Sequence, residues 1–512
     1  MSSALNSSAV AVNTLGLVGT GAMCRGIAQI AAQAGIQVLL FDALPGAAAK
    51  AREAVIGTLA KLAEKGKISA QDLAATQARL QVLDDLAGMA PAQVVIEAIV
   101  ENLEIKRQLF KDLEAIVAAD CLLASNTSSL SVTAIAAACA RPERVGGFHF
   151  FNPVPLMKIV EVIDGLSSAP WVGPTLLALG SRMGHTAVRT LDTPGFIVNH
   201  AGRGYTTEAL RCLGECIAPV HVVDAIMRDA AGFRMGPFEL LDLTGLDVSQ
   251  PVMEAIYHQY YEEPRYRPSA LGAQRLAGGL LGRKSGRGFY RYSEGKAEPV
   301  PSAPAPAARP AQVWVSRLNQ AWGNAVAELV LALGGKLDSG PRPADDSLCV
   351  VTPLGEDASS ACLAQGLDPA RTVAIDCLFG HDKRRTLMST PLTTAAMREA
   401  ALGLFGADAV PASLIADSAG FVAQRIIAMV VNVACDIAQQ GIATAADIDR
   451  AVTLGLGYPL GPLSFGDKLG PSRILAILKA MQDFYGDPRY RPSPWLTRRA
   501  RLGVSLLTEA QS

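Results

Sequence analysis

The chain has 512 residues, half of them hydrophobic, and its 46 basic side chains nearly balance 47 acidic ones. With a net charge near zero there is no global field to attract nucleic acid or an anionic membrane surface, so local groups must hold any anionic ligand. The length predicts roughly three or four domains, and no apolar run reaches the ~20 residues of a membrane-spanning helix. The nine scattered cysteines, and a start without a targeting pattern, favour a cytoplasmic protein with reduced thiols.

From Thr14 the chain alternates short β-rich runs with helical patterns. The strand-like runs are Leu15–Val18, Gln37–Phe41, Gln93–Ala98 and Leu122–Ala124, and the helical patterns are Gly21–Ala34, Gly46–Glu64 and Leu103–Ala118. This alternation predicts an α/β domain with a mainly parallel sheet covered by helices on both faces, over residues 1–190.

The residue pattern changes after Thr193-Pro-Gly195 from alternating strand-like and helical runs to mostly helical ones. Long helical patterns predict an all-α domain over residues 191–293, and the Pro/Ala-rich run of residues 294–312 predicts a stiff linker. Residues 313–410 contain apolar runs but no glycine fingerprint, which favours a degenerate α/β segment.

An internal repeat links the end of the chain to the all-α domain. Asp192-Thr-Pro-Gly-Phe-Ile-Val-Asn199 reappears as Asp417-Ser-Ala-Gly-Phe-Val-Ala-Gln424, an offset of 225 residues (417 − 192). Other Asp, Gly and Pro positions recur at the same offset. Residues 411–512 are therefore predicted to be a second copy of the all-α domain.

A glycine loop lies between the first strand and the first helix. Its sequence, Gly19-Thr-Gly21-Ala-Met-Cys24, stands where a dinucleotide fingerprint requires it, and Asp42 follows the next strand about 20 residues on. Cys24 replaces the usual third glycine. An acid at the second strand suits the ribose hydroxyls of NAD better than the phosphate of NADP. A strand-to-helix turn without a ligand is the alternative.

Further polar groups follow other strands of this domain. Glu97 and Glu101 flank the end of one, and Ser125-Asn-Thr-Ser-Ser129 follows the next. Helix-dipole and capping roles are the alternatives for these residues. The cations of the second helical pattern suit a phosphorylated ligand, or form a solvated face; they are Lys50, Arg52, Lys61, Lys65 and Lys67.

A histidine and a glutamate flank two strand-like runs separated by prolines. The segment runs from Gly147 to Glu161, and its proline turn predicts two extended strands that place His149 beside Glu161. An imidazole oriented by a carboxylate transfers protons. A structural histidine in a core is the alternative.

Taken together, these motifs resemble the L-3-hydroxyacyl-CoA dehydrogenase family over about residues 14–292. They stand in one order: the glycine loop, Glu97–Asn102, Ser125–Ser129, His149–Pro153 and Thr193–Asn199. The extended form, with a second helical region, is similar to the bacterial 3-hydroxyadipyl-CoA dehydrogenases of phenylacetate breakdown. The resemblance implies NAD-dependent oxidation of (3S)-3-hydroxyacyl-CoA to 3-oxoacyl-CoA.

The resemblance also implies roles for single residues. The catalytic base falls on His149, its carboxylate partner on Glu161, and the substrate-positioning groups on Ser128 and Asn199, which would bridge the first two domains. The implied NAD contacts are Gly19, Thr20, Gly21, Ala22, Met23, Cys24, Asp42, Glu101, Lys106, Ser128, Asn152 and Lys284. The implied coenzyme A contacts are Thr58, Lys65 and Ser128, and no metal site is implied.

The chemistry suits these residue types. As hydride leaves the hydroxyl-bearing carbon for the cofactor, a neutral imidazole can accept the hydroxyl proton, and a carboxylate on the opposite ring nitrogen stabilises the imidazolium.

The second copy lacks a glycine loop and carries Gln424 where Asn199 stands, which predicts one active site per chain. Because helical domains of the family pair between subunits, residues 411–512 are expected to pack on 192–290 as an internal pseudo-dimer, with a homo-oligomer still open.

Three alternatives remain open on the sequence alone. The first is a general short-chain 3-hydroxybutyryl-CoA dehydrogenase, the second a dehydrogenase of free hydroxy acids, and the third a catalytically silent NAD-binding sensor or structural protein. Arg203 is a candidate for holding the distal carboxylate of a dicarboxylic acyl group.

Overall fold

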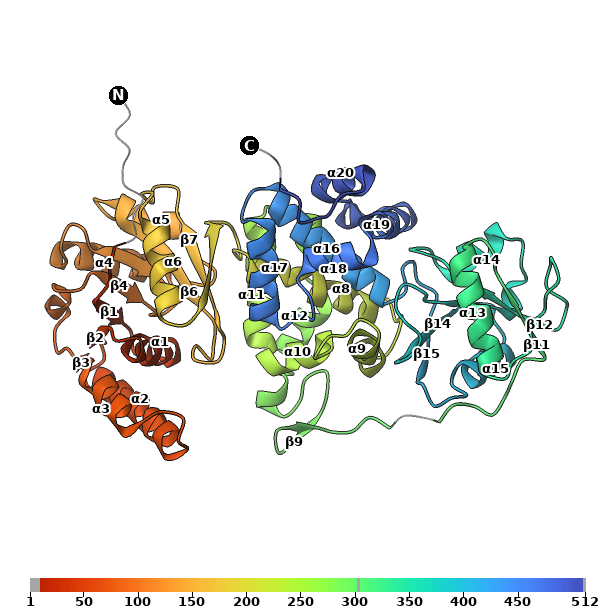
Figure 1. The fold of residues 1–512 in the computed structure, drawn as a ribbon, viewed down its shortest axis with the longest axis horizontal. Helices are drawn as coiled ribbons and strands as arrows, with labels where there is room; N and C mark the ends of the chain where they lie inside the picture. Colours follow the sequence, from red (N-terminus) through yellow and green to blue (C-terminus); the bar gives the residue numbers. More distant parts are fainter. Residues whose placement is uncertain (1–9, 302–303, 510–512) are drawn as a thin grey trace, which may run out of the picture. The chain divides into compact units, whose positions relative to one another are not determined.

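The computed structural model describes residues 10–301 and 304–509 (Figure 1). The contacts within the chain divide it into two units. Within the described chain, unit 1 comprises the residues up to His200 and the segment Gln440–Leu456, and unit 2 comprises Ala201–Gln439 and the residues from Gly457 onward. The N-terminal segment in which the sequence predicts no targeting pattern lies, up to residue 9, outside the described residues.

Unit 1 is built on an eight-stranded sheet of order β3-β2-β1-β4-β5-β6-β7-β8. Its strands are β1 Thr14–Val18, β2 Gln37–Phe41, β3 Leu80–Val82, β4 Val94–Glu97, β5 Leu122–Ser125, β6 Val145–Phe150, β7 Ile159–Asp164 and β8 Thr186–Leu191. All neighbours are parallel except β6 and β7, so the last two strands run against the other six.

Helices cover both faces of this sheet (Figure 1). The helices of unit 1 are α1 Ala22–Gln33, α2 Ala47–Glu64, α3 Ala70–Ala78, α4 Leu103–Ile116, α5 Val132–Ala136, α6 Val172–Arg182, α7 Val198–Ala201 and α17 Ala445–Leu456. Successive strand side chains point to opposite faces, so Val94 and Ile96 of β4 join the core under α1 and α6, whereas Val95 joins the core under α4 and α5. The carboxyl ends of the six parallel strands meet at one edge, where the polar motifs stand.

The predicted alternation of strands and helices in this domain is confirmed to within two residues at each end. The sequence pattern missed α3 and β3. Helix α3 follows α2 after a short turn, and Ser69 begins it by accepting a hydrogen bond from the N–H of Asp72 in a capping box. Strand β3 has three residues and only one buried side chain, too little for a periodic signal.

Unit 2 contains helices from both predicted all-α segments. They are α8 Arg203–Gly214, α9 Val220–Asp229, α10 Pro237–Thr244, α11 Leu246–Gln259, α12 Ala270–Ala277, α16 Ala423–Gln439, α18 Pro462–Leu469, α19 Pro471–Tyr485 and α20 Pro494–Leu502. Helices α8 and α16 cross where Gly204 touches the backbone of Met429 and Val430. A glycine there lets the two helix backbones approach closely.

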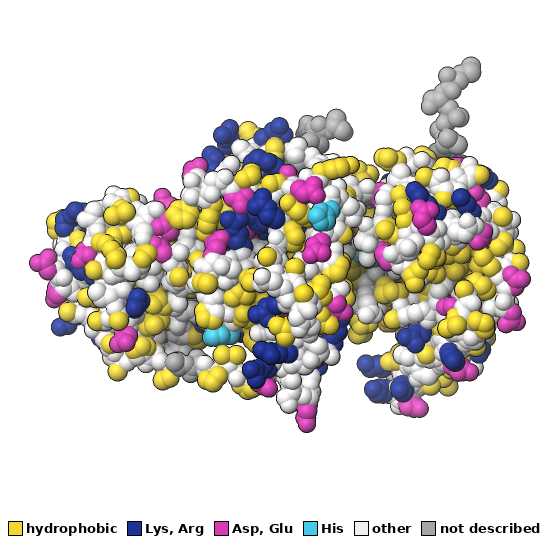
Figure 2. Space-filling model, turned by 180° about the vertical axis from the view of Figure 1, so that it is seen from behind, with side chains coloured by type: hydrophobic (Ala, Val, Ile, Leu, Met, Phe, Trp, Pro, Cys, Tyr) yellow, Lys and Arg dark blue, Asp and Glu magenta, His cyan; other side chains and the backbone are white. Residues whose placement is uncertain are grey.

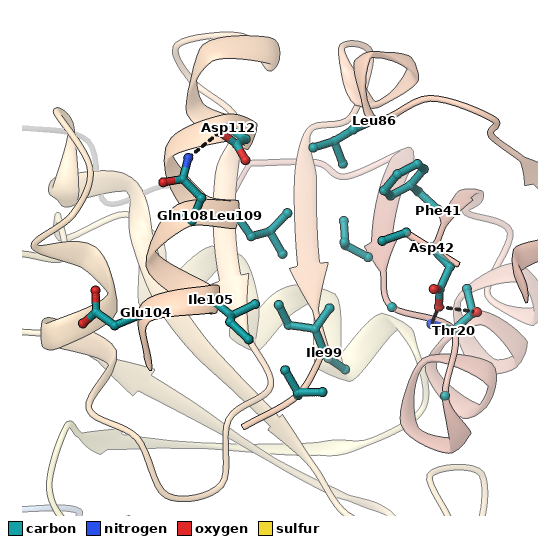
Figure 3. Close-up of a pocket in the computed structure, with 16 residues that line it drawn as sticks. Thr20, Phe41, Asp42, Leu86, Ile99, Glu104, Ile105, Gln108, Leu109 and Asp112 are labelled. Carbon is teal, nitrogen blue, oxygen red and sulfur yellow. Dashed lines mark hydrogen bonds between the residues drawn. The ribbon is translucent and has the colours of Figure 1, made fainter. Parts of the chain in front are cut away.

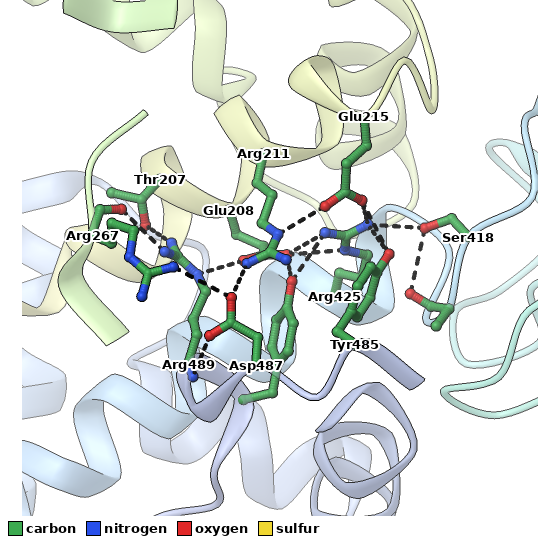
Figure 4. Close-up of polar contacts among 12 residues, drawn as sticks. Thr207, Glu208, Arg211, Glu215, Arg267, Ser418, Arg425, Tyr485, Asp487 and Arg489 are labelled. Carbon is green, nitrogen blue, oxygen red and sulfur yellow. Dashed lines mark hydrogen bonds and ion pairs between the residues drawn. The ribbon is translucent and has the colours of Figure 1, made fainter. Parts of the chain in front are cut away.

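A buried network of charges joins the helices of unit 2 (Figure 4). Glu208 of α8 has no exposed side-chain surface and accepts hydrogen bonds from Arg425 of α16 at 2.8 and 3.0 Å and from Arg489 at 3.1 Å. Although burial works against ionisation, these two guanidinium groups hold the pKa of Glu208 below its ordinary value. Glu215 binds the far side of Arg425 at 2.8 Å.

Unit 2 also contains a five-stranded sheet of order β11-β12-β13-β14-β15. Its elements are β11 Gln312–Val315, α13 Gln320–Ala332, β12 Ser347–Val351, α14 Ala358–Ala364, β13 Thr372–Ile375, β14 Arg385–Ser389, α15 Ala395–Phe405 and β15 Ala412–Ile415. Only the β13–β14 pair is antiparallel, which reproduces the order and directions of β4 to β8. The open edge of β11 is covered by a bridge between Val313 and Leu337.

Two segments differ from the sequence expectation. Strand β15 lies inside residues 411–512, predicted to be all helical, because its buried residues pair with β14. The predicted linker of residues 294–312 begins with a small hairpin of β9 Tyr292–Ser293 and β10 Lys296–Ala297. Its turn residues Glu294 and Gly295 both have positive φ, as a tight hairpin turn requires. None of the described helices is both long and apolar enough to cross a membrane.

Candidate active site

The glycine loop joins β1 to α1 as predicted. Gly19 has φ +87°, and a Cβ there would lie 2.8 Å from the carbonyl oxygen of Ala98, so only glycine fits this turn. Gly21 is the N-cap of α1, and a Cβ built on it would meet open space. The first N–H groups of α1 therefore point at a free approach for an anion.

Cys24, which replaces the third glycine of the usual pattern, is 1% exposed in the interior face of α1. Its thiol contacts the carbonyl oxygen of Val18 at 3.7 Å, and burial raises its pKa well above the ordinary value. The thiol is therefore a packing group between helix and strand. Gly26, two residues on, was missed by the sequence pattern, and a Cβ there would lie 2.7 Å from Val154.

Asp42 stands at the carboxyl end of β2, beside the glycine loop (Figure 3). Its carboxylate accepts hydrogen bonds from the N–H and the hydroxyl of Thr20, both at 2.7 Å, and from the N–H of Leu44 at 2.9 Å. Although partial burial acts the other way, these donors hold the pKa of Asp42 below its ordinary value. The carboxylate is thus ionised at neutral pH and fixed in direction.

A cleft of about 830 Å³ opens between this carboxylate and helix α4 (Figure 3). Its walls are largely apolar, with Ile99, Ile105 and Leu109 among the lining residues, and Gly19 and Asp42 at one end. An apolar slot that ends in a carboxylate and a helix N-terminus suits a flat base, a ribose and a pyrophosphate in that order.

The Ser125–Ser129 segment forms a loop at the end of β5, and Glu101 organises it. One oxygen of Glu101 accepts hydrogen bonds from the Thr127 hydroxyl at 2.6 Å, from the Ser128 N–H at 3.0 Å and from the Ser129 N–H at 3.2 Å. Burial opposes ionisation of Glu101, but the Thr127 hydroxyl and the Lys106 ammonium hold its pKa below the ordinary value. Glu101 therefore anchors the loop as an ionised carboxylate.

His149 and Glu161 lie directly opposite each other in the antiparallel pair β6–β7, so the predicted juxtaposition is confirmed. Nδ1 of His149 lies 2.7 Å from Oε2 of Glu161, and the other glutamate oxygen accepts the N–H groups of Ile197 and Val198, each at 2.9 Å. Glu161 is fully buried and His149 is 5% exposed. Within the described chain, Nε2 of His149 has no hydrogen-bond partner and is available to a ligand.

Two asparagines follow the strands around this pair. Asn199 is half-buried and comes directly after Val198, whose N–H binds Glu161, so it lies next to the dyad along the chain and belongs to unit 1. Asn152 is exposed in the turn between β6 and β7. The Phe150 N–H donates to the Asn126 side chain at 2.9 Å, which ties the Ser125–Ser129 loop to the strand of His149.

The implied coenzyme A contacts, Thr58 and Lys65, are exposed on α2 and at its C-cap. They are seven positions apart, about two helical turns, so they lie on one face of the helix, with Lys61 between them. The Thr58 hydroxyl donates to the carbonyl oxygen of Ala54 at 3.0 Å. Figure 2 shows the basic side chains gathered on the α2–α3 helix pair, where Arg52 is bound to the Leu80 carbonyl oxygen at 2.8 Å.

Lys284 lies in unit 2, within the short 3₁₀ helix Arg283–Ser285, whose N-cap is Gly282. Its ammonium binds Asp247 at 2.6 Å, and its side chain is 45% exposed. Its predicted contact with NAD stays a prediction. Arg203, the candidate for a distal carboxylate, is buried at the start of α8 in the same unit.

Several site residues escaped the sequence analysis. Thr127 and Asn126 were seen only as parts of a polar run, and Glu97 only as one of two flanking acids; the backbone donors at Ile197 and Val198 carry no signal in side-chain type at all. The Phe196 and Phe151 rings lie beside His149, with ring centroids 5.8 and 4.4 Å away. Both rings lie outside the strands, Phe151 just after β6 and Phe196 between β8 and α7, so no strand pattern marked them as neighbours of His149.

Comparisons with known proteins place these motifs in a family. The model described as 3-hydroxyacyl-CoA dehydrogenase, NAD binding domain, matches residues 14–193, and the corresponding C-terminal domain model matches residues 195–292 and 420–506. The chain is 38% identical over 491 residues to a 3-hydroxyadipyl-CoA dehydrogenase of Escherichia coli K12, covering 96% of this chain and 98% of the relative. It is 41% identical over 278 residues to a probable 3-hydroxybutyryl-CoA dehydrogenase of Bacillus subtilis, covering 54% of this chain and 96% of that one.

A solved structure resembles the whole chain. It is a 3-hydroxybutyryl-CoA dehydrogenase from Escherichia coli K12, with a TM-score of 0.84 and 37% identity, covering 96% of this chain and 99% of that one. The names of the two full-length matches differ in the acyl group, so they agree on the reaction and not on the substrate's length.

Proposed function

The chain belongs to the 3-hydroxyacyl-CoA dehydrogenase family, NAD-dependent oxidoreductases, and from this premise we propose that it oxidises 3-hydroxyadipyl-CoA to 3-oxoadipyl-CoA in phenylacetate breakdown. The observation that carries the chemistry is the buried contact of 2.7 Å between His149 and Glu161. The adipyl substrate is proposed from the likeness to a 3-hydroxyadipyl-CoA dehydrogenase over 96% of the chain. The solved structure of a 3-hydroxybutyryl-CoA dehydrogenase covers the same share, so the short-chain substrate is the second candidate.

The residues of the first unit fit NAD. The turn at Gly19 and the free approach beside Gly21 leave room for a pyrophosphate at the start of α1, and the ionised Asp42 suits ribose hydroxyls and repels a 2′-phosphate. When bound, the nicotinamide ring supplies the hydride acceptor. We infer that the implied contacts at Glu101, Ser128 and Asn152 orient that ring.

In the proposed mechanism, Nε2 of His149 accepts the proton of the 3-hydroxyl group. Glu161 binds Nδ1 and keeps the free lone pair on Nε2, and its negative charge stabilises the imidazolium that forms. The N–H groups of Ile197 and Val198 hold the carboxylate in place, so little reorganisation accompanies the transfer. Ser128 and Asn199 are proposed to donate to the hydroxyl or thioester oxygen.

Binding of the coenzyme A moiety is proposed on α2. Thr58, Lys61 and Lys65 share one face of that helix, where cations can neutralise phosphates of the nucleotide. These contacts, and the NAD contact of Lys284, rest on the resemblance to the family.

Comparison of two substrates in the reducing direction tests the proposal. NADH oxidation is followed with acetoacetyl-CoA and with 3-oxoadipyl-CoA, for the wild type and for His149→Ala. A preference for the dicarboxylate that the substitution abolishes supports both the dyad and the adipyl substrate. Equal or faster turnover of acetoacetyl-CoA instead identifies a short-chain 3-hydroxybutyryl-CoA dehydrogenase. Turnover of free 3-oxo acids, or NADH binding without any turnover, contradicts the proposal.

For the second half of the chain, we propose that residues 313–410 are the remnant of an NAD-binding domain and that residues 411–512 duplicate the helical domain of residues 191–293. The strand order and directions of β11–β15 match those of β4–β8, which supports the remnant. Asp417 accepts the N–H groups at the start of α14 just as Asp192 accepts those at the start of α5. No equivalent of β1, the glycine loop or His149 accompanies the remnant in the sequence.

An internal pseudo-dimer of the two helical copies is the proposed assembly. Two backbone hydrogen bonds are reciprocal at the repeat offset: Leu191 donates to Ile442, and Ala416 donates to Ile217. Reciprocal contacts of this kind are the signature of a two-fold interface. The exchange of α17 onto β7 and β8 in unit 1 also supports it. One active site per chain, a cytoplasmic location and the absence of a nucleic-acid partner complete the proposal.

A further inference from the structure

Glu97 and Glu101 stand on either side of the turn into α4 and share one ammonium group, that of Lys106. Nζ of Lys106 lies 2.8 and 2.9 Å from the two oxygens of Glu97 and 3.3 Å from Oε2 of Glu101. Glu97 has no exposed surface and Lys106 is 1% exposed. A buried ammonium must remain with its counter-charge, so Glu97 decides where Lys106 sits.

The carboxylate of Glu97 is also fixed by hydrogen bonds from residues other than Lys106. The Ser125 hydroxyl donates to its Oε1, and the N–H of Ile99 donates to its Oε2 at 3.1 Å. Ser125 is its direct neighbour across the β4–β5 pair. The Ser125 hydroxyl and the Ile99 N–H therefore hold the Glu97 carboxylate in place independently of Lys106.

The other end of this chain of contacts is the Ser125–Ser129 loop. Lys106 binds Oε2 of Glu101, and Oε1 of Glu101 binds Thr127, Ser128 and Ser129. Thr127 and Ser129 both turn their hydroxyls to Glu101. The Ser128 hydroxyl, by contrast, makes no hydrogen bond to any part of the chain that the structure describes, and the side chain is half-buried. The contacts thus leave one hydroxyl of the loop available.

We propose that Glu97 is a positioning residue for the dehydrogenase reaction: through Lys106 it fixes the carboxylate of Glu101, and through Glu101 it directs Ser128 at the reacting atoms. The inference rests on the proposed role of Ser128, and the implied contact of Lys106 with NAD stays a prediction beside it. Without the Glu97 charge, the ammonium is drawn to Glu101 and competes with the loop's own donors for that carboxylate.

The substitution Glu97→Gln keeps the shape of the side chain and removes its charge. We expect kcat/KM for 3-oxoacyl-CoA reduction to fall roughly 10- to 100-fold, the loss typical of small misplacements at a reacting centre, and the Kd of NADH to rise. The matched control is Glu143→Gln, the same change at an exposed glutamate that pairs with Arg141 at 3.1 Å. Wild-type kinetics for Glu97→Gln would overturn the proposal.

A double-mutant cycle separates positioning from general destabilisation. The variants are Glu97→Gln, Lys106→Met and the two combined, and the combined variant also removes both buried charges if the single change impairs folding. If Glu97 acts through Lys106, the combined variant has the same kcat/KM and NADH affinity as Lys106→Met alone. Losses that multiply would show two independent roles and refute the inference.

The same measurements keep the two proposals apart. If the wild type binds NADH but reduces no 3-oxoacyl-CoA, the proposed function fails, while the NADH affinities of the cycle still test the path from Glu97 to the loop. If the wild type is active and the losses of kcat/KM in the two single variants multiply in the combined variant, the proposed function stands and the positioning role of Glu97 fails.

Discussion

His149 and Glu161 are cross-strand neighbours whose side chains meet at 2.7 Å, and the glutamate is itself held by two backbone N–H groups. The β6–β7 pairing sets the distance between the two side chains. The N–H groups of Ile197 and Val198, at the start of α7, set the direction of the Glu161 carboxylate. The dyad is therefore as rigid as the sheet that carries it. A base oriented in this way needs no movement of the backbone to accept its proton.

The first prediction concerns this glutamate. Glu161→Gln retains the hydrogen-bonding shape but loses the charge that stabilises the imidazolium, so we expect kcat to fall by about 10²–10⁴-fold, with NADH affinity nearly unchanged. Single-turnover and steady-state rates measure the first quantity, and NADH fluorescence titration the second. The control is Asp164→Asn on the same strand, whose carboxylate pairs with Arg189 away from the dyad. A loss of NADH binding equal to the loss of kcat would contradict the assignment.

The second prediction concerns cofactor choice. Asp42→Asn removes the charge that is proposed to bind the ribose hydroxyls, and a charge-assisted hydrogen bond of this kind is worth roughly 1.5–3 kcal/mol, or about ten- to hundredfold in Kd. We expect weaker NADH binding and a smaller preference for NADH over NADPH, because the repulsion of a 2′-phosphate is lost as well. Asp84→Asn, at an exposed acid just beyond β3, is the matched control. Unchanged discrimination in Asp42→Asn would show that another group selects the cofactor.

The positions of the His149–Glu161 pair and of Asp42 were readable from the sequence because both depend on local signals. Prolines after His149 forced a turn between two apolar runs, and the period of those runs put His149 and Glu161 on one side. The position of Asp42 followed from the length of one β-α-β unit. In each case the elements concerned are neighbours along the chain, so periodicity and turn residues suffice.

Other features depend on which of two helices with similar apolar faces packs against a given sheet. Helix α17 lies in residues 411–512, the proposed second copy, yet it packs on β7 and β8 of unit 1. The two proposed copies share the repeated sequence pattern, so nothing local distinguishes exchange from self-packing. The Glu97–Lys106 pair escaped prediction for a related reason: burial of two charges depends on the angle at which α4 leaves β4, which no residue type encodes.

The third prediction tests the close approach of α8 and α16. A methyl group at Gly204 would lie 2.8–2.9 Å from backbone atoms of Met429 and Val430, so Gly204→Ala should lower the free energy of unfolding by about 1–3 kcal/mol. Gly214→Ala, on the same helix, meets only Leu271 at 3.6 Å and should be neutral or stabilising by up to ~1 kcal/mol. Urea unfolding of both variants measures the contrast. Equal stability of the two would mean that the helices are not held in this contact.

The fourth prediction concerns the buried network of Figure 4. Glu208→Gln leaves Arg425 and Arg489 without their shared counter-charge, and breaking a buried ion pair in this way typically costs about 3–5 kcal/mol. The pKa of Glu208 is lowered in the fold, so its stabilising effect is present above the ordinary carboxyl pKa and is lost as the pH falls through the folded value. The stability gap between wild type and Glu208→Gln should therefore narrow in acid. A gap that widens in acid contradicts the assignment.

The fifth prediction concerns Asp376, which follows β13. Its effect on stability changes with pH in the direction opposite to that of Glu208. Its Oδ1 accepts the Gln424 side chain at 2.9 Å and the Leu378 N–H at 3.0 Å, while burial raises its pKa to about 6. His381, which binds the Asp376 carbonyl oxygen, has a pKa lowered by burial, so it provides no compensating charge at neutral pH.

Between the ordinary pKa of 3.8 and about 6 the folded protein keeps a proton that the unfolded chain has released, so this residue lowers stability as the pH rises, by about 3 kcal/mol at most. Asp376→Asn stays neutral and retains an oxygen for both donors. We expect its stability relative to the wild type to be greater at pH ~8 than at pH ~5, as thermal unfolding at both pH values would measure. A difference that does not change with pH would mean that Asp376 is ionised in the fold, with Gln424 and Leu378 sufficient to hold its charge.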